Sequence, residues 1–423
     1  MNRSLATLNG HAARGMLAAA LAVAMLAGGC VSYDVREANA TPAIEAERDI
    51  PQEQLLDVGV TVLDPGIPED PLEREEKGIY PQVRKTEARV IAYETRDTLQ
   101  NTSQWGAVRI VPRDASTDLL VTGKILESNG EILRVRFKVV DATGREWLDK
   151  EYEDIASKYA YRDDIELNED PFQDIYNSLA NDMLAVRKEL GSETAVGIRQ
   201  VARLRFAEEL SPYAFGDYLA QDEETGRYTV ARLPAESDPM LERVEEIRQR
   251  DYLFIDTLDA HYAGFAQDVH EPYDDWRKYT YDETVALREV KRSARNRMLA
   301  GIGSVIGGAV MAGKSDSYIG QVGGYAGVIG GIGIFKSGLD RRKESEIHED
   351  ALKELSESLE SELKPMVVDI EGKTVTLTGT VEAQYEEWRE LLKEIYTAET
   401  GRVVSENTPH PDVSVGYEET GTD

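Results

Sequence analysis

The sequence predicts an α+β fold in several domains: an N-terminal α/β sandwich-like domain with a mixed sheet, a central helical region with a glycine-rich helical hairpin, and a small C-terminal αββα(β) module. Three observations predict this. Valine-rich alternating segments occur near both ends of the chain, apolar residues at helical spacing dominate the middle, and 13 of the 34 glycines fall within 301–338. A chain of 423 residues has room for about two or three domains.

The first thirty residues have the pattern of a secretion signal that ends in a lipid-attachment cysteine. Arg3 and Arg14 precede an uncharged run from Gly15 to Gly29, and the chain's single cysteine, Cys30, follows. The run is too short and too alanine-rich for a dependable transmembrane helix. It resembles the bacterial lipoprotein signal, which implies removal of 1–29 and acylation of Cys30, for example with palmitate. An ordinary secretion signal with an incidental cysteine is the alternative.

The charge of the chain limits its partners. The net charge is −31, from 79 acidic and 48 basic residues. Such a surface repels nucleic acid, so we expect no nucleic-acid partner.

With no second cysteine, the mature chain has neither an intramolecular disulfide nor, after acylation, a thiol nucleophile. The acidic segment after the leader lacks hydrophobic periodicity, and 30–54 is therefore expected to be a flexible lipidated tether.

Residues 55–190 are expected to form an α/β domain. Valines alternate at 58–62 and predict a strand, and apolar residues at helical spacing over 88–99 predict a helix. A second strand follows at 108–111. Further along the chain, a strand around 147–152 and a helix over 172–190 with one apolar stripe would complete a sheet covered by helices.

The clearest local signal in this domain is a hairpin. The segments 119–125 and 133–139 are apolar strands joined across Asn129-Gly130, and Asn-Gly supplies the positive φ angles of a tight turn. The second arm alternates strictly. One face holds Leu133, Val135, Phe137 and Val139, and the other holds Arg134, Arg136 and Lys138.

The order of elements in this domain carries a family resemblance. A valine-rich strand, a helix, the strings DLLVTGKI at 118–125 and VVDATGR at 139–145, and a closing helix resemble the α/β domain of the curli-secretion lipoproteins and the amino-terminal domain of the TolB family. These families include secretion pores, assembly factors and synthase activators. The resemblance therefore implies a cell-envelope context and no particular activity.

The segment 191–297 reads as mostly helical, with breaks near Ser211-Pro212, 222–226 and 234–239. It is followed at 298–338 by two apolar segments, 298–313 and 317–335. Glycines spaced by four allow close helix packing, and we expect this role for Gly303, Gly307, Gly320, Gly324, Gly327 and Gly331.

Clusters of Lys and Arg at 288–297 and 336–343 flank these apolar segments. The arrangement resembles the glycine-zipper hairpins of bacterial outer-membrane lipoproteins. That resemblance implies a hairpin, within 298–335, that inserts in or oligomerises at a membrane. A hairpin buried in a soluble core is the alternative.

The C-terminal module is expected at 339–407, followed by a disordered tail at 408–423. A leucine-striped helix, the string VVDIEGKTVTLTGTV at 367–381, and a second helix resemble a BON domain. That family occurs in envelope proteins and is linked to phospholipid contact and protection from osmotic stress.

Motifs for chemistry are weak. The string GAVMAGKS at 308–315 fits a phosphate-binding loop, but glycines run on both sides and no buried strand precedes it. His261 and His270 have acids nearby, yet they are nine residues apart and lack the spacing that helps ligands converge on a zinc ion. We therefore predict no catalytic residue, metal or cofactor.

Together these features predict a non-enzymatic lipoprotein on the periplasmic face of the outer membrane, a scaffold or partner-recruiting factor in envelope assembly or integrity. Val31 follows Cys30 in place of the aspartate that retains enteric lipoproteins in the inner membrane, which is the alternative location. The expected partners are membrane lipid, envelope proteins of unknown identity and further copies of the chain. An oligomeric secretion-channel component and an envelope hydrolase are the alternative functions.

Overall fold

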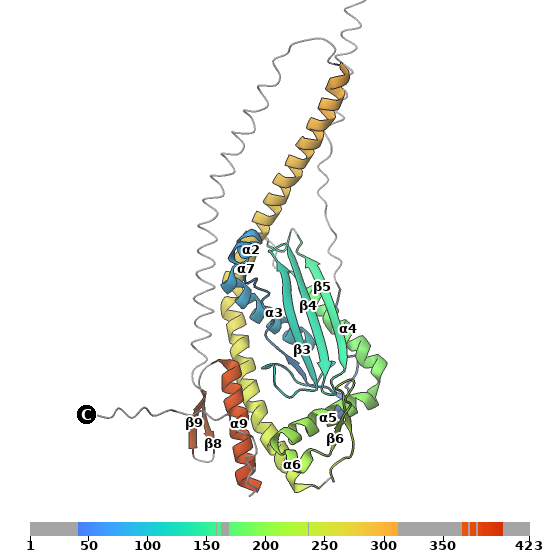
Figure 1. Cartoon of the computed structure of the whole chain (residues 1–423), viewed down its shortest axis with the longest axis vertical. Coiled ribbons are helices and arrows are strands. Elements are labelled where there is room, and N and C mark those ends of the chain that lie inside the picture. Colours follow the sequence, from blue (N-terminus) through green and yellow to red (C-terminus); the bar gives the residue numbers. More distant parts are fainter. Residues whose placement is uncertain are drawn as a thin grey trace, which may run out of the picture. The chain divides into compact units, whose positions relative to one another are not determined.

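A five-stranded mixed sheet lies at the centre of the fold, with strand order β2-β1-β3-β4-β5 (Figure 1). β1 runs parallel to both of its neighbours, and β3 to β5 form an antiparallel meander. The predicted α+β class with a mixed sheet is confirmed. The strands are β1 (Val58–Val60), β2 (Val108–Ile110), β3 (Leu119–Ser128), β4 (Ile132–Asp141) and β5 (Glu146–Ile155).

This computed structural model describes residues 41–157, 159–161, 169–235, 237–311, 366–370, 373–377 and 380–400, without the side chains of 287, 289–311, 366–370 and 373–377. All of them belong to one compact unit. The remaining elements are a 3-10 helix (Gln52–Gln54), α2 (Pro71–Glu76), α3 (Pro81–Asn101), α4 (Gln173–Leu190), α5 (Ser192–Leu210), α6 (Pro212–Phe215), β6 (Leu219–Gln221), β7 (Tyr228–Val230), α7 (Pro239–Met311), β8 (Met366–Ile370), β9 (Lys373–Leu377) and α9 (Val381–Thr400).

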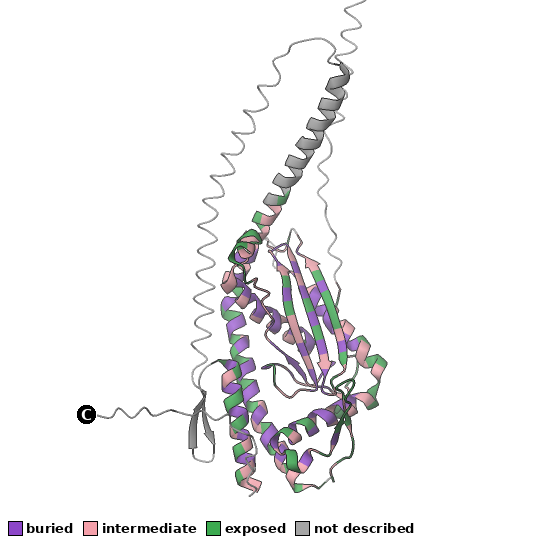
Figure 2. Ribbon diagram, in the orientation of Figure 1, coloured by how far each residue is buried: buried purple, intermediate pink, exposed green. Residues whose placement is uncertain are grey.

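The β3–β4 hairpin follows its predicted alternation. Leu133, Val135, Phe137 and Val139 are buried in the main core, and Figure 2 shows buried and exposed positions alternating along these strands. On the other face Arg136 pairs with Asp149 of β5 and Lys138 with Glu146. These half-exposed ion pairs contribute little stability each, so the apolar face determines the register.

The turn of this hairpin differs from the prediction in one respect. Gly130 has a positive φ of 76°, but Asn129 does not. The Asn129 side-chain oxygen instead accepts hydrogen bonds from the backbone N–H groups of Glu131 and Ile132. Asn129 therefore shapes the turn through its side chain, as asparagine commonly does.

Helices cover one face and one edge of the sheet. α3 and α4 pack on the inner face, and the predicted α3 stripe of Ala88, Ile91, Ala92, Thr95 and Leu99 is buried. α7 lies along the edge strand β2, where Asp259 accepts a hydrogen bond from the N–H of Ile110 at 2.8 Å. This contact occupies a backbone donor that an edge strand would otherwise expose.

The described part of the predicted tether, 41–54, is fixed to the folded body. The N–H of Thr41 donates to Asp174 of α4, and Arg199 of α5 donates to the carbonyl groups of Gln52 and Leu55. The expectation of a flexible tether up to residue 54 is wrong for this stretch. The acidic composition of this segment gave no sign that its backbone groups form hydrogen bonds with side chains of helices far away in the sequence.

The region 191–297 is helical as predicted, with one addition and one difference. β6 and β7 form a short hairpin around the expected break at 222–226. α7 is one helix of 73 residues that passes through Pro272 and continues to Met311. At 1.5 Å per residue it is about 110 Å long.

Gly303 and Gly307 lie within α7, one helical turn apart. The other glycines of the expected hairpin, Gly320, Gly324, Gly327 and Gly331, and the lipidation site Cys30 lie outside the described residues. Among the described helices, none combines the length and the apolar character needed to cross a bilayer.

The predicted C-terminal module is not separate at its second helix. β8 and β9 form the expected antiparallel hairpin. However, α9 packs on α5 and α7 and shares a core with them that includes Phe206, Phe254 and Trp388. The apolar face of α9 is buried against these two helices rather than within a separate module.

Candidate functional site

A cavity of about 810 Å³ lies between α3, α4 and α7 and is the candidate ligand site. Residues of the segments 41–45, 160–161 and 169–171 complete its walls. A pocket of this size can hold a small organic ligand. Its walls include Val90, Glu94, Thr98, Tyr161, Asp170, Asp174, Asn177, His270, Tyr273, Asp274 and Arg277.

Carboxylates dominate the cavity. Among the described residues, eight acidic ones line it, against the two basic residues Arg277 and Lys278 and the single histidine His270. The acids are Glu45, Glu94, Asp97, Glu169, Asp170, Asp174, Asp274 and Asp275. Carboxylates in a concave site attract cations and hydrogen-bond donors more strongly than on an open surface. The arrangement therefore favours a cationic group and disfavours an anion.

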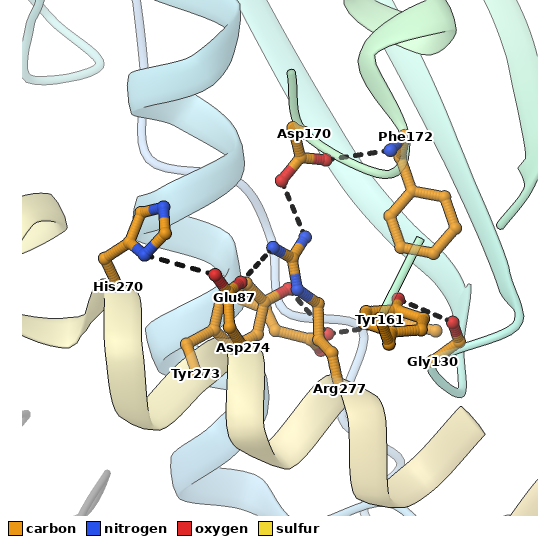
Figure 3. Close-up of polar contacts among 10 residues, drawn as sticks. Glu87, Gly130, Tyr161, Asp170, Phe172, His270, Tyr273, Asp274 and Arg277 are labelled. Carbon is orange, nitrogen blue, oxygen red and sulfur yellow. Dashed lines mark hydrogen bonds and ion pairs between the residues drawn. The ribbon is translucent and has the colours of Figure 1, made fainter. Parts of the chain in front are cut away.

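Arg277 of α7 organises the inner wall of the cavity (Figure 3). Its guanidinium, with a side-chain exposure of 6%, donates to Asp170 at 2.7 Å and also pairs with Asp274. It lies over the ring of Tyr273, 4.5 Å from the centroid. The other oxygen of Asp170 accepts from the N–H of Phe172. This network fixes the loop before α4 to α7 through charge-assisted hydrogen bonds.

A second polar cluster, around Glu87, lies behind the cavity wall that contains Arg277. Glu87 of α3 is fully buried, and its carboxylate accepts hydrogen bonds from Ser128 at 2.5 Å and from Tyr273 at 3.1 Å. The side chain of Arg84 lies 3.4 Å from the other oxygen. Because these residues come from α3, β3 and α7, the cluster joins three elements behind the cavity wall.

Glu94 is the acid of the cavity whose environment changes its chemistry most. Burial first, and then the negative charges of Asp170 and Asp97, raise the pKa of Glu94 to about 7. A carboxyl group with this pKa exchanges its proton near neutral pH, which makes the charge of the cavity sensitive to pH.

Replacing Glu94 with Gln is expected to stabilise the fold at pH 8 and to change little at pH 4. The folded pKa of about 7 lies above the ordinary 4.5. The folded state therefore holds the proton more tightly, and stability is lost as the pH rises between these values. The amide removes this loss, a gain of about 2 kcal/mol at pH 8 after allowance for partial exposure. Urea denaturation at both pH values measures the change.

Asp275→Asn changes an exposed carboxylate of the same cavity and is the matched control for Glu94→Gln. A gain in stability for Glu94→Gln that is equal at pH 4 and pH 8 would contradict the raised pKa of Glu94. The destabilisation arises only when this carboxyl group loses its proton, so its removal must depend on pH.

The two histidines considered for a metal site lie on α7. His261 is exposed, and His270 lies 3.1 Å from Asp274 at the cavity. Within the described ranges, no three His, Cys, Asp or Glu side chains are arranged to hold a metal ion. The phosphate-loop string 308–315 lies partly outside the described residues, and its first part is helix.

Sequence reasoning missed the cavity itself. Its acids come from segments of the chain far apart in sequence, such as Glu94, Asp170 and Asp274, and no short motif relates them. Comparison of the chain with protein-family models, with curated proteins and with solved structures found no match in any of the three.

Proposed function

We propose that this protein is a non-enzymatic lipoprotein, anchored through Cys30 on the periplasmic face of the outer membrane, that holds or recruits partners in cell-envelope assembly or integrity. The observation that supports it best is the continuity of α7. Val269, Tyr273 and Trp276 of α7 are part of the main core, and the same helix continues through the basic cluster at 288–297 to Met311. A folded body and a glycine-rich apolar segment are thus joined by unbroken helix.

This continuity suits a scaffold. A basic cluster beside an apolar segment is favourable at the headgroup region of a bilayer. An apolar attachment at 298–335 would supplement the acyl chains on Cys30, since two attachments hold a protein on a membrane more firmly than one. The helix would then fix the orientation of the body, because a continuous helix cannot pivot freely as a loop does.

The acidic cavity supplies a place for recruitment. Its excess of carboxylates suits a cationic group on a partner, such as a lysine or arginine side chain or an amine. The cavity lies against the part of α7 that contains His270, Asp274 and Arg277. Binding there would act on the helix that leads to the proposed membrane segment.

The test is fractionation of cells that express three variants, together with mass spectrometry of the wild-type N-terminus. One variant has an ordinary cleavable secretion leader in place of residues 1–30, the second lacks 298–338, and the third combines both changes. We expect an acylated Cys30 in the wild type, membrane association of each single variant, and release of the combined variant. An unmodified Cys30 thiol, or an intact leader on the exported chain, would contradict the proposal.

A further inference from the structure

The groove between α5 and α7 holds α9 through aromatic side chains. Phe254 of α7 stacks on Trp388 of α9 with ring centroids 5.7 Å apart, and it lies 5.6 Å from the ring of Tyr385. Leu392, Ile395 and Tyr396 extend the same buried face of α9. This is the arrangement in which an amphipathic helix lays its apolar face into a groove.

Charged side chains match α9 to this groove. Arg389 of α9 pairs with Glu209 of α5 and lies 3.4 Å from Asp251 of α7. Asp251 is only 1% exposed, and its carboxylate accepts hydrogen bonds from Tyr385 and Arg389 of α9. An occupant without an arginine at this position would leave a buried carboxylate unpaired, which is costly.

A second ion pair determines the direction of α9. Glu399, near the end of α9, pairs with Arg243 near the start of α7 and lies 3.7 Å from Arg250. Tyr385, near the start of α9, meets Phe254 further along α7. α9 is therefore antiparallel to α7, and the groove is specific for a helix with this order of aromatic, basic and acidic residues.

A long stretch of sequence separates the part of α7 that forms the groove from α9. α7 passes the groove and runs on to Met311, and from Tyr262 to that point it covers roughly 70 Å. α9 starts at Val381. The advantage of a chain's own segment over the same segment of a neighbour falls as the connection lengthens, because the effective concentration falls. The identical helix of a neighbouring copy makes the same contacts, so it competes for the groove once copies of the chain are concentrated.

We propose that the groove between α5 and α7 binds α9 of a second copy of this chain, so that two copies associate by exchanging their α9 helices. The second copy is the occupant that the groove specifies, since it supplies Tyr385, Trp388 and Arg389 in the required order. Exchange of an identical element needs no contact beyond those already made within one copy.

The structure supplies a direct test. Lys393 of α9 lies 3.9 Å from Glu209 of α5, and Lys150 of β5 lies 2.7 Å from Asp182 of α4. Normal and heavy-nitrogen-labelled full-length chains are mixed in equal amounts, incubated and treated with a carbodiimide, which joins an amine to a contacting carboxylate. Mass spectrometry then identifies the isotopes in each crosslinked peptide pair. We expect about half of the Lys393–Glu209 links to join a light to a heavy chain, and the Lys150–Asp182 links to stay unmixed.

Lys393–Glu209 links that remain unmixed, or that do not form at all, overturn the proposal. Arg389→Glu is the matched variant, because it places a third carboxylate beside Glu209 and Asp251. It should remove the mixed Lys393–Glu209 links. Lys150–Asp182 links in the same sample report that the sheet and α4 remain folded.

Discussion

Arg277→Met is expected to lower the free energy of unfolding by about 3–5 kcal/mol. The guanidinium is buried, and it pairs with Asp170 and Asp274. Methionine keeps most of the apolar stem but leaves Asp170, whose side chain is 9% exposed, with its cation removed. A buried carboxylate without its cation bears the full cost of desolvation. The midpoint of urea denaturation, at unchanged slope, measures the loss.

Two further variants separate this explanation from a loss of packing. Adding Asp170→Asn to Arg277→Met removes the unpaired charge, so the double variant should be more stable than the single one. Arg136→Met breaks the half-exposed pair with Asp149 on the outer face of the sheet and should cost less than about 1 kcal/mol. If Arg277→Met cost no more than Arg136→Met, the network would not be what fixes the loop to α7.

The elements that the sequence predicted well are those with a strong local signal. The alternation from Leu133 to Val139 needs only one buried face to determine its register, and the stripe from Ala88 to Leu99 needs only one sheet to pack on. The continuity of α7 was missed because the change from charged to apolar composition at residue 298 was taken as a boundary. No glycine or proline occurs between Pro272 and Gly301, so the sequence contains no signal that ends the helix there.

Contacts between residues far apart in the sequence account for the remaining differences between the predictions and the structure. The segment 41–54 looked like a tether because its partners, such as Asp174 and Arg199, lie far away in the sequence. The cavity was hidden because a chain with 79 acidic residues places carboxylates near every position. Only the fold distinguishes Glu94, which is largely buried beside Asp170, from the many acids that remain in solvent.

Gly130→Ala is expected to lower the free energy of unfolding by about 3 kcal/mol or more. Gly130 has a φ of 76°, and an added methyl group would lie 2.4 Å from the carbonyl oxygen of Arg277 and 2.5 Å from the backbone nitrogen of Tyr281. Both atoms belong to the backbone of α7, so no side-chain rotation relieves the overlap. The hairpin and α7 would have to move apart. Thermal or urea denaturation measures the loss.

Gly78→Ala is the matched control for this substitution. Gly78 also has a positive φ, 62°, but an added methyl group there would meet no atom within 4 Å. It should therefore cost only the backbone strain of a left-handed residue, about 1–2 kcal/mol. The difference between the two variants isolates the contact of the hairpin with α7. Faster hydrogen exchange in α7 around Arg277, for Gly130→Ala alone, would show that the turn holds this helix against the sheet, whereas equal losses for both variants would mean that it does not.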